Sequence, residues 1–297
     1  MEQQDNSRRM AIKKIAGTTA AAIAGVSMAH RLSAAEAILD DKLKGNINHS
    51  VCRWCYSNIQ LEDLCKAAKS IGISSIELTG PDEWAMLRKY DLTSALPNGA
   101  GKGITQGFND PKLHDELVES YSAIIPKVAA AGLNQLICFS GNRNGLDDEK
   151  GIENCAIGLK RLMPIAEKHK VTLVMELLNS KVNHPDYQCD HTVWGAALCD
   201  KIGSDRFKLL YDIYHMQIME GDVIATIRKY NKYISHYHTG GVPGRNEIDE
   251  TQELNYPAIM KAILETGFKG YVAQEFIPKR EDKIASLKQG VQICDVA

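Results

Sequence analysis

The sequence predicts an α/β protein whose parallel strands close into a (β/α)8 barrel, and three observations favour this fold class. Strand-like and helix-like segments alternate from about residue 46 to the end of the chain, as they do in proteins with parallel sheets. They form eight units of about 30 residues each, which matches such a barrel in number and in total length. No G-x-G-x-x-G motif follows the first predicted strand, as it would in a dinucleotide-binding open sheet. We therefore expect one barrel domain over residues 46–297.

Eight short segments are the predicted strands. Each is apolar or rich in β-branched residues, and most are followed closely by Gly, Asn, Pro or Asp, which commonly end strands. The predicted strands are Ile47–Val51, Ser75–Leu78, Leu92–Leu96, Gln135–Ser140, Thr172–Leu177, Lys208–Tyr214, Ile234–Thr239 and Tyr271–Phe276.

The segments between the predicted strands have helical patterns. In Ile259–Leu264, for example, the apolar residues recur at the spacing of one helix face. Gly72, Gly132 and Gly267 each follow such a segment, and glycine favours the left-handed conformation that ends a helix. The predicted helices include Leu61–Ile71, Leu113–Ala131, Gly151–Lys168, Val223–Lys229 and Tyr256–Thr266.

The first residues differ in composition from the rest of the chain. Ser7–Lys13 contains the adjacent Arg8 and Arg9, and a mildly apolar, alanine-rich run follows at Ala16–Ala29. This is the layout of an export signal, and the paired arginines indicate the twin-arginine route. The segment resembles the consensus Ser-Arg-Arg-x-Phe-Leu-Lys, with Ala11 where Phe is usual. We expect residues 1–37 to be an export signal and flexible segment and the mature protein to be periplasmic; a basic tail or surface helix is the alternative.

Composition limits the classes of partner. The formal net charge of −2 argues against nucleic acid, which requires a basic surface. The sequence contains no run of about 18 to 20 apolar residues, which is the length that a membrane span needs. The partner we expect is a small-molecule hydroxy-carbonyl or sugar substrate, and the sequence leaves the oligomeric state open, a homo-oligomer being one alternative. Cys52 and Cys55 form a CxxC motif, but without a second such pair we expect buried or lining cysteines rather than a zinc or redox site.

Polar residues stand near the ends of the last four predicted strands. In a (β/α)8 barrel the chemistry lies at the carboxyl ends of the strands. The separations between these four residues are 36, 26 and 37 residues, about one strand–helix unit each, so they should lie at one side of the barrel mouth. They are Glu176, Asp212, His238 and Glu275.

These four side chains predict a metal site. Carboxylates within apolar strands are costly to bury unless they are paired, protonated or bound to a metal. Two Glu, one Asp and one His form a hard, mostly oxygen donor set, which suits one divalent ion, Mn²⁺ first, with Mg²⁺ and Co²⁺ as alternatives. The competing interpretation is that each carboxylate caps a loop or forms an ordinary salt bridge.

Three motifs give the chain a resemblance to a known family. Pro-Gly-Arg-Asn-Glu at Pro243–Glu247 and Glu-Leu-Asn-Tyr at Glu253–Tyr256 follow the seventh predicted strand, and Asp-Ile-Tyr-His at Asp212–His215 ends the sixth. On these motifs the chain resembles the xylose-isomerase-like TIM-barrel superfamily over roughly residues 46–295. It is most similar to the hydroxypyruvate isomerase family and its relatives, the ketose 3-epimerases.

The resemblance implies a role for each matching residue. It implies that the four strand-end residues bind the metal, and that Glu176 and Glu275 are also the catalytic pair that removes and returns a proton. It implies that His215 and Arg245 bind substrate oxygens. From its place at the end of the first predicted strand, Trp54 is a further candidate for the pocket wall, with a core position as the alternative.

Two departures leave the substrate open. His238 stands where hydroxypyruvate isomerases usually carry Gln and the 3-epimerases carry His. The additional substrate-binding Glu of the epimerases, six residues after Glu176, would fall on Val182. The resemblance therefore implies an isomerase acting on a small hydroxy-carbonyl compound through an enediolate. A ketose 3-epimerase, a lyase or hydrolase acting on an oxidised sugar, and a non-catalytic sugar-binding protein are the alternatives.

Overall fold

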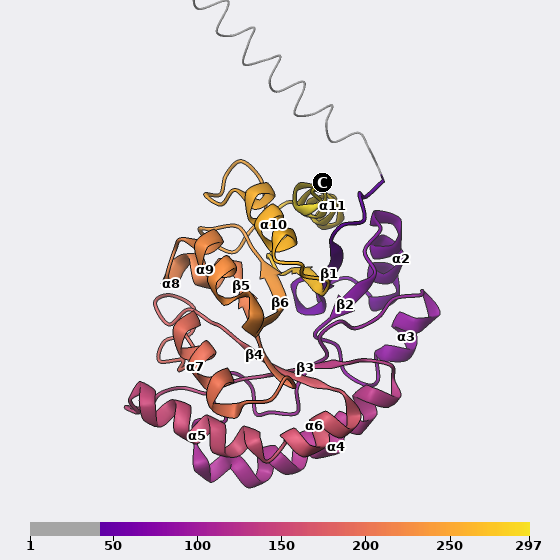
Figure 1. Cartoon of the computed structure of the whole chain (residues 1–297). Coiled ribbons are helices and arrows are strands. Elements are labelled where there is room, and N and C mark those ends of the chain that lie inside the picture. The colour runs from indigo at the N-terminus through magenta and orange to yellow at the C-terminus, as the bar shows by residue number, and fades with distance from the viewer. Residues whose placement is uncertain (1–41) are drawn as a thin grey trace, which may run out of the picture. The chain divides into compact units, whose positions relative to one another are not determined.

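The structure is a computed structural model that describes residues 42–297 of the chain. Within these residues, seven strands form one parallel sheet in the order β2-β1-β7-β6-β5-β4-β3 (Figure 1). This sheet, with helices between its strands, confirms the predicted fold class. The strands are β1 (Asn48–Cys52), β2 (Ser75–Glu77), β3 (Gln135–Cys138), β4 (Thr172–Glu176), β5 (Phe207–Asp212), β6 (Ile234–Thr239) and β7 (Tyr271–Gln274).

The third predicted strand, Leu92–Leu96, is not a regular strand. It is joined to β2 by one isolated bridge, between Ser75 and Thr93, and by single hydrogen bonds farther along. On its other side one hydrogen bond, from Ile137 N to Pro97 O, links it to β3. Pro97 has no N–H to donate, so the ladder cannot continue there. The segment thus takes the eighth place of the barrel without regular pairing.

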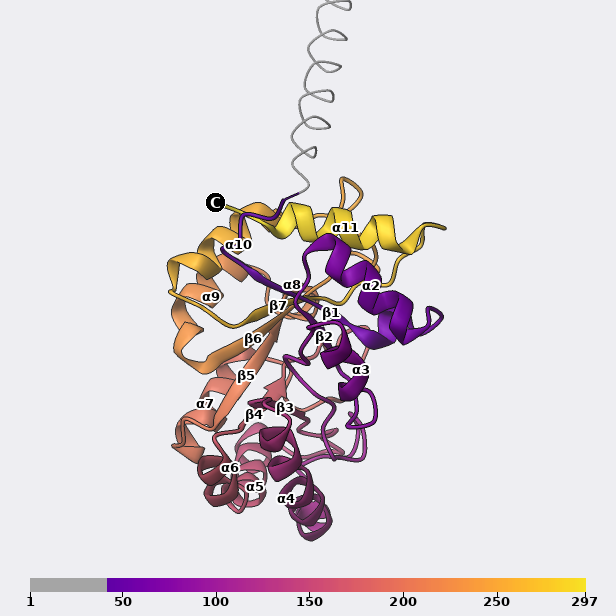
Figure 2. The same cartoon turned by 90° about the vertical axis from the view of Figure 1, so that its right-hand side faces the viewer.

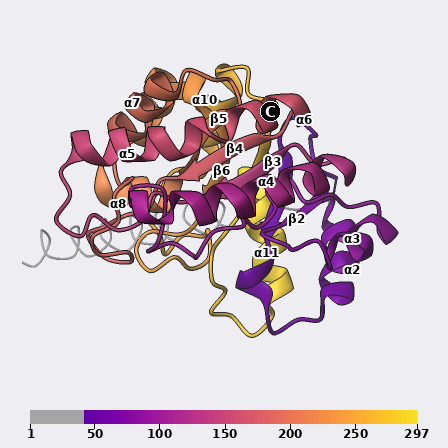
Figure 3. The same ribbon diagram turned by 90° about the horizontal axis from the view of Figure 1, so that it is seen from below.

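Helices surround the strands, as three views at right angles show (Figures 1, 2 and 3). They are α2 (Leu61–Ile71), α3 (Trp84–Lys89), α4 (His114–Ala130), α5 (Asp148–Lys160), α6 (Met163–His169), α7 (Thr192–Ile202), α8 (Ile213–Met219), α9 (Val223–Tyr230), α10 (Tyr256–Glu265) and α11 (Lys283–Cys294). Short 3-10 helices are η1 (Arg53–Tyr56), η2 (Pro111–Leu113) and η3 (Asn231–Tyr233). No helix of the described residues is long and apolar enough to cross a membrane.

Local sequence signals explain several helix ends. Gly72, Gly132 and Gly267 have φ angles of 94°, 79° and 81°, so they supply the left-handed residue that the sequence predicts after each helix. The single helix predicted over 151–168 is instead two helices, α5 and α6. Pro164 lies in the first turn of α6, where its missing N–H is tolerated, and α5 ends before it, at Lys160.

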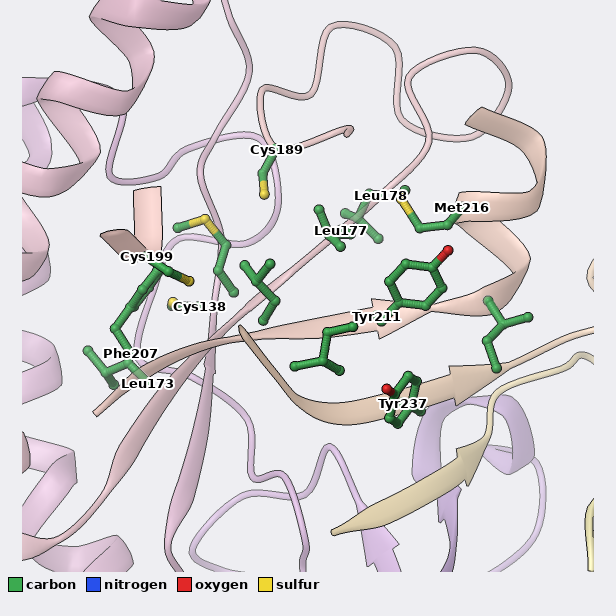
Figure 4. Close-up of a cluster of buried hydrophobic side chains, with 14 of the residues drawn as sticks. Cys138, Leu173, Leu177, Leu178, Cys189, Cys199, Phe207, Tyr211, Met216 and Tyr237 are labelled. Carbon is green, nitrogen blue, oxygen red and sulfur yellow. The ribbon is translucent and has the colours of Figure 1, made fainter. Parts of the chain in front are cut away.

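Most of the hydrophobic core lies between the sheet and the helices. Figure 4 shows part of it, where Leu173, Phe207 and Tyr211 from β4 and β5 lie among side chains of the neighbouring segments. All eight cysteines are buried and unpaired, which agrees with the expectation of buried cysteines, including those of the CxxC motif.

The barrel interior has an apolar part and a polar part. Successive side chains of a strand point to opposite faces, so the neighbours of the outward-facing core residues point inward. Leu96, Ile137, Val174 and Leu210 form a small separate apolar cluster. The inward positions of β1, β2 and β6 are instead polar, and they are Ser50, Cys52, Ser75, Glu77, His236 and His238. This polar part lies next to the candidate site.

Candidate active site

The structure brings the four predicted strand-end residues together. Glu176 and Asp212 are the last residues of β4 and β5, His238 is the last but one of β6, and Glu275 directly follows β7. Asp212 and His238 are paired across β5 and β6, which places them at the same height. One ligand atom of each residue lies within 4.8 Å of those of the other three, and all four side chains are buried. The spacing of these four residues along the sequence therefore predicted correctly that they lie together.

His238 lies between the two glutamates that the resemblance singles out. Its Nδ1 is 2.7 Å from Oε2 of Glu275 and 3.4 Å from Oε1 of Glu176. Trp54 donates a hydrogen bond of 2.7 Å from its Nε1 to Oε1 of Glu275. Each oxygen of Glu275 therefore has a separate partner, which fixes the orientation of this carboxylate.

Arg245 closes one side of the cluster. Its Nη2 is 3.1 Å from Oδ2 of Asp212 and also contacts Oε2 of Glu275. The guanidinium lies 5.3 Å from the ring centroids of both Trp54 and Tyr214. The backbone of Arg245 has a φ of 58°, a conformation that costs a non-glycine residue free energy and that is concentrated at functional sites. The loop therefore holds this cation in place against two carboxylates.

Burial and charge set the pKa values of the three carboxyl groups. Burial raises the pKa of Glu176, and the nearby charge of Glu275 raises it further. Burial also raises the pKa of Asp212, against the opposing effect of Arg245. Burial would raise the pKa of Glu275 too, but Arg245 and His238 outweigh it and hold that pKa well below its usual range. The carboxyl groups thus differ in how readily they hold a proton.

The donor set fits a divalent cation. Three buried carboxylates face one guanidinium and one imidazole, and Oε1 of Glu176 has no hydrogen-bond partner although it is buried. Buried carboxylates are stable only with compensating charge or hydrogen bonds. Three oxygen donors and one nitrogen donor are the ligands that Mn²⁺, Mg²⁺ and Co²⁺ accept.

A cavity of about 620 Å³ opens beside this cluster. Glu176, Glu275, Arg245 and Trp54 line it on the polar side. The remaining wall is mostly apolar and includes Leu78, Ile104, Ile137, Phe139 and Leu178. A mostly apolar cavity with a few converging polar groups is typical of a small-molecule site.

The three predicted substrate-binding residues lie in different places. Trp54 and Arg245 line the cavity, and the side chain of Trp54 is 41% exposed. His215, in the first turn of α8, is fully buried; its Nε2 is 3.6 Å from Oδ2 of Asp212. The ring of His184 lies 5.2 Å from that of His215 and lines the cavity in its place.

Sequence reasoning missed three polar residues here. His184 lies in the segment between β4 and α7, and no pattern in the sequence marks it. From the sequence, neither His236 nor Glu77 was singled out as a site residue, although Glu77 lies near the end of a predicted strand, as the four cluster residues do. In the structure, Nε2 of His236 and Nε2 of His238 are 2.8 and 2.7 Å from Oε1 of Glu77.

Comparisons with known proteins agree with this fold. The sequence profile of the family described as "Xylose isomerase-like TIM barrel" matches residues 65–294. The 2-oxo-tetronate isomerase of Cupriavidus necator is 34% identical over 109 residues, which are 37% of this chain and 41% of that protein. The hydroxypyruvate isomerase of Escherichia coli is 28% identical over 170 residues, or 57% of this chain and 65% of that protein. The matched stretches thus span less than two thirds of either relative.

A solved structure gives the same result for the fold. The crystal structure of "AP endonuclease, family 2" from Brucella melitensis superposes with a TM-score of 0.72 at 24% identity. The match covers 82% of this chain and 97% of that chain. Since the family profile also covers more than half of the sequence, this protein belongs to the xylose isomerase-like TIM barrel family.

Proposed function

We propose that this protein is a metal-dependent isomerase that moves a proton on a small hydroxy-carbonyl compound. Hydroxypyruvate or a similar short keto acid is the first candidate substrate. The observation that carries the proposal is the pair of buried carboxylates, Glu176 and Glu275, which both contact His238 Nδ1 and both line the cavity. Such an isomerisation needs one group to remove a proton next to a carbonyl and one to return it. The names of the two relatives support the same class of reaction.

The metal would be held by Glu176, Asp212, His238 and Glu275, with Mn²⁺ as the first candidate. When bound, a divalent ion supplies Lewis-acid stabilisation of the negative charge that develops on the substrate oxygens. Oε1 of Glu176 makes no hydrogen bond, its contact with His238 Nδ1 being 3.4 Å, and the three carboxylates outnumber the cations beside them. Both observations support this assignment.

The different environments of the two glutamates suit an acid and a base. Glu275 stays ionised beside Arg245, and only an ionised carboxylate can accept a proton. Burial raises the pKa of Glu176, so without a bound ion this group holds a proton more readily than Glu275 does. Two carboxyl groups whose surroundings separate their pKa values are the usual arrangement for paired acid–base work.

Arg245 and Trp54 would bind and orient the substrate. Arg245 is permanently charged, lines the cavity and presents a planar set of N–H donors, which suits a carboxylate or a pair of hydroxyl groups. Trp54 places an exposed ring beside Glu275, so it would cover the carbon face of a substrate whose oxygens point to the cluster. His215, which is buried behind His184, would act through Asp212 rather than by direct contact.

The size of the cavity favours a second candidate substrate, a free ketose. At about 620 Å³ the cavity lies within the range of about 300–1,000 Å³ that holds drug-sized ligands. A three-carbon acid would leave most of it to water. The histidine at position 238 is the residue that the ketose 3-epimerases carry there, so epimerisation of a ketose is the alternative activity of the same site.

The metal assignment predicts the metal content of variants. The purified mature protein should contain one divalent ion per chain after reconstitution with Mn²⁺. Asp212→Ala and His238→Ala should each lose most of it, because each removes one of four ligands. Asp200→Ala, which changes an exposed carboxylate on α7, is the control and should keep full occupancy. Near-full metal content in both ligand variants would refute the assignment.

The acid–base assignment predicts the effect of Glu275→Gln. The amide keeps an oxygen for the Trp54 hydrogen bond but cannot accept the proton. Loss of a positioned general base costs about 10²- to 10⁴-fold in rate, and the additional loss of a ligand should place the effect near the upper end. Turnover is measured with hydroxypyruvate and with free ketoses, with Glu265→Gln on the surface as the control.

Turnover in heavy water tests the same assignment in the wild-type protein. A proton held by a carboxylate exchanges with solvent, so deuterium should enter the product at the reacting carbon. A hydride shift would keep the original hydrogen on the molecule.

An unchanged rate in Glu275→Gln would contradict the base assignment, whichever substrate is turned over.

We also propose that the protein is exported through the twin-arginine route to the periplasm. The residues that suggest this, within 1–37, lie outside the part of the chain that the structure describes. Replacing Arg8 and Arg9 with Lys should retain the protein inside the cell, whereas the unchanged chain should appear in the periplasmic fraction. Equal export of both chains would show that the twin-arginine interpretation is wrong.

A further inference from the structure

A fully buried polar group lies inside the barrel directly behind His238. Glu77, at the end of β2, accepts a hydrogen bond of 2.7 Å from Nε2 of His238 and one of 2.8 Å from Nε2 of His236. All three side chains are inaccessible to solvent. Strands β2 and β6 are not neighbours in the sheet, because β1 and β7 lie between them. Glu77 therefore reaches β6 across the barrel interior.

The direction of these hydrogen bonds fixes the orientation of the His238 ring. An ionised carboxylate can only accept, so Nε2 of each histidine must carry the hydrogen. The other ring nitrogen of His238, Nδ1, faces Glu176 and Glu275 at 3.4 and 2.7 Å. Without an ion it carries a hydrogen by the same rule, and a bound ion would replace that hydrogen. A histidine that binds a metal through one ring nitrogen commonly donates the other N–H to a carboxylate, which sets both the tautomer and the ring angle.

The three residues of this group are joined by hydrogen bonds. Oε1 of Glu77 lies 2.8 and 2.7 Å from the Nε2 atoms of His236 and His238, which is hydrogen-bond length. Both imidazoles therefore share one carboxylate oxygen, and we describe the group as a hydrogen-bonded support of the metal site.

The position of the group separates it from the substrate. Among the described residues that line the cavity, neither Glu77 nor His236 is present. Barrel interiors are usually filled with branched apolar side chains, and the opposite part of this interior holds Leu96, Val174 and Leu210. The burial of the Glu77 carboxylate in such a place is explained by the histidine side chains that it holds in position.

We infer that Glu77 is a positioning residue that holds His238 with Nδ1 directed at the metal site, and that His236 in turn holds Glu77. The inference rests on the proposed function in one respect only, namely that His238 binds the ion. It adds to the four ligands a fifth residue, Glu77 on β2, that this chain needs in order to bind metal well.

The test measures Mn²⁺ affinity by equilibrium dialysis, independently of turnover. Glu77→Leu removes the acceptor and fills the space with an apolar side chain, whereas Glu77→Gln keeps one acceptor oxygen. The control is Ser50→Ala, which removes another buried interior hydrogen bond, from Ser50 Oγ to Ser75 Oγ at 2.9 Å. Circular dichroism checks that each variant is folded.

Glu77→Leu should bind Mn²⁺ about 10- to 100-fold more weakly than the wild type, as loss of such a support does elsewhere. Glu77→Gln should recover part of this loss, and Ser50→Ala should bind as the wild type does. Wild-type affinity in folded Glu77→Leu would overturn the inference, and so would two Mn²⁺ ions per wild-type chain. If Glu77→Leu does not fold, the side-chain ¹⁵N spectrum of the wild-type protein loaded with Zn²⁺ decides. A hydrogen on Nε2 of His238 supports the inference, and a hydrogen on Nδ1 overturns it.

The two proposals fail in different ways. Unaltered Mn²⁺ affinity in Glu77→Leu, together with an active wild-type enzyme, would remove the role of Glu77 and leave the isomerase intact. A wild-type protein that binds Mn²⁺ and turns over no hydroxy-carbonyl substrate would contradict the proposed reaction, while the weaker binding of Glu77→Leu would still support the positioning role.

Discussion

The candidate site depends on His238, whose two ring nitrogens face carboxylates on opposite sides. Nδ1 faces Glu176 and Glu275 at the barrel mouth, and Nε2 donates to Glu77 in the interior. Burying this many carboxylates in one place is costly unless each has a partner. The neighbouring features supply those partners: Arg245 is held over Asp212 and Glu275, and Trp54 donates to the remaining oxygen of Glu275.

The fold provides this arrangement because parallel strands end at the same edge. Asp212 and His238 are paired across β5 and β6, and Glu176 and Glu275 end or follow the strands on either side. The cavity next to them has one polar and one apolar side. A substrate would therefore direct its oxygens to the metal site and Arg245 and its carbon skeleton toward the apolar wall, with the reacting carbons beside Glu176 and Glu275.

The sequence was sufficient to predict the strand-end residues and insufficient to predict their supports. Glu176, Asp212, His238 and Glu275 recur at the spacing of a strand–helix unit, so a periodic pattern places them together. Glu77 lies far from this run in the sequence, and it reaches its partners on β6 because the sheet curves through β1 and β7. His236 looks like any other residue of an apolar strand when only its neighbours in the sequence are known.

Two elements of the fold also differ from those that the sequence predicted. Segment 92–96 has the composition of a strand, but Pro97 directly after it cannot donate to β3. The helical pattern over 151–168 is continuous in its apolar positions, yet Pro164 divides it in two. In both places a proline lies where the predicted regular element is interrupted, and the spacing of apolar residues alone does not show the interruption.

The central claim is that this cluster binds one divalent ion through His238 Nδ1. It is tested most directly by a crystal structure of the Mn²⁺-loaded protein, with anomalous scattering recorded at the manganese edge. The account predicts one anomalous peak among Glu176, Asp212, His238 Nδ1 and Glu275, with His238 Nε2 still bonded to Glu77. A manganese peak elsewhere, or none in this cluster at full metal content, would contradict it.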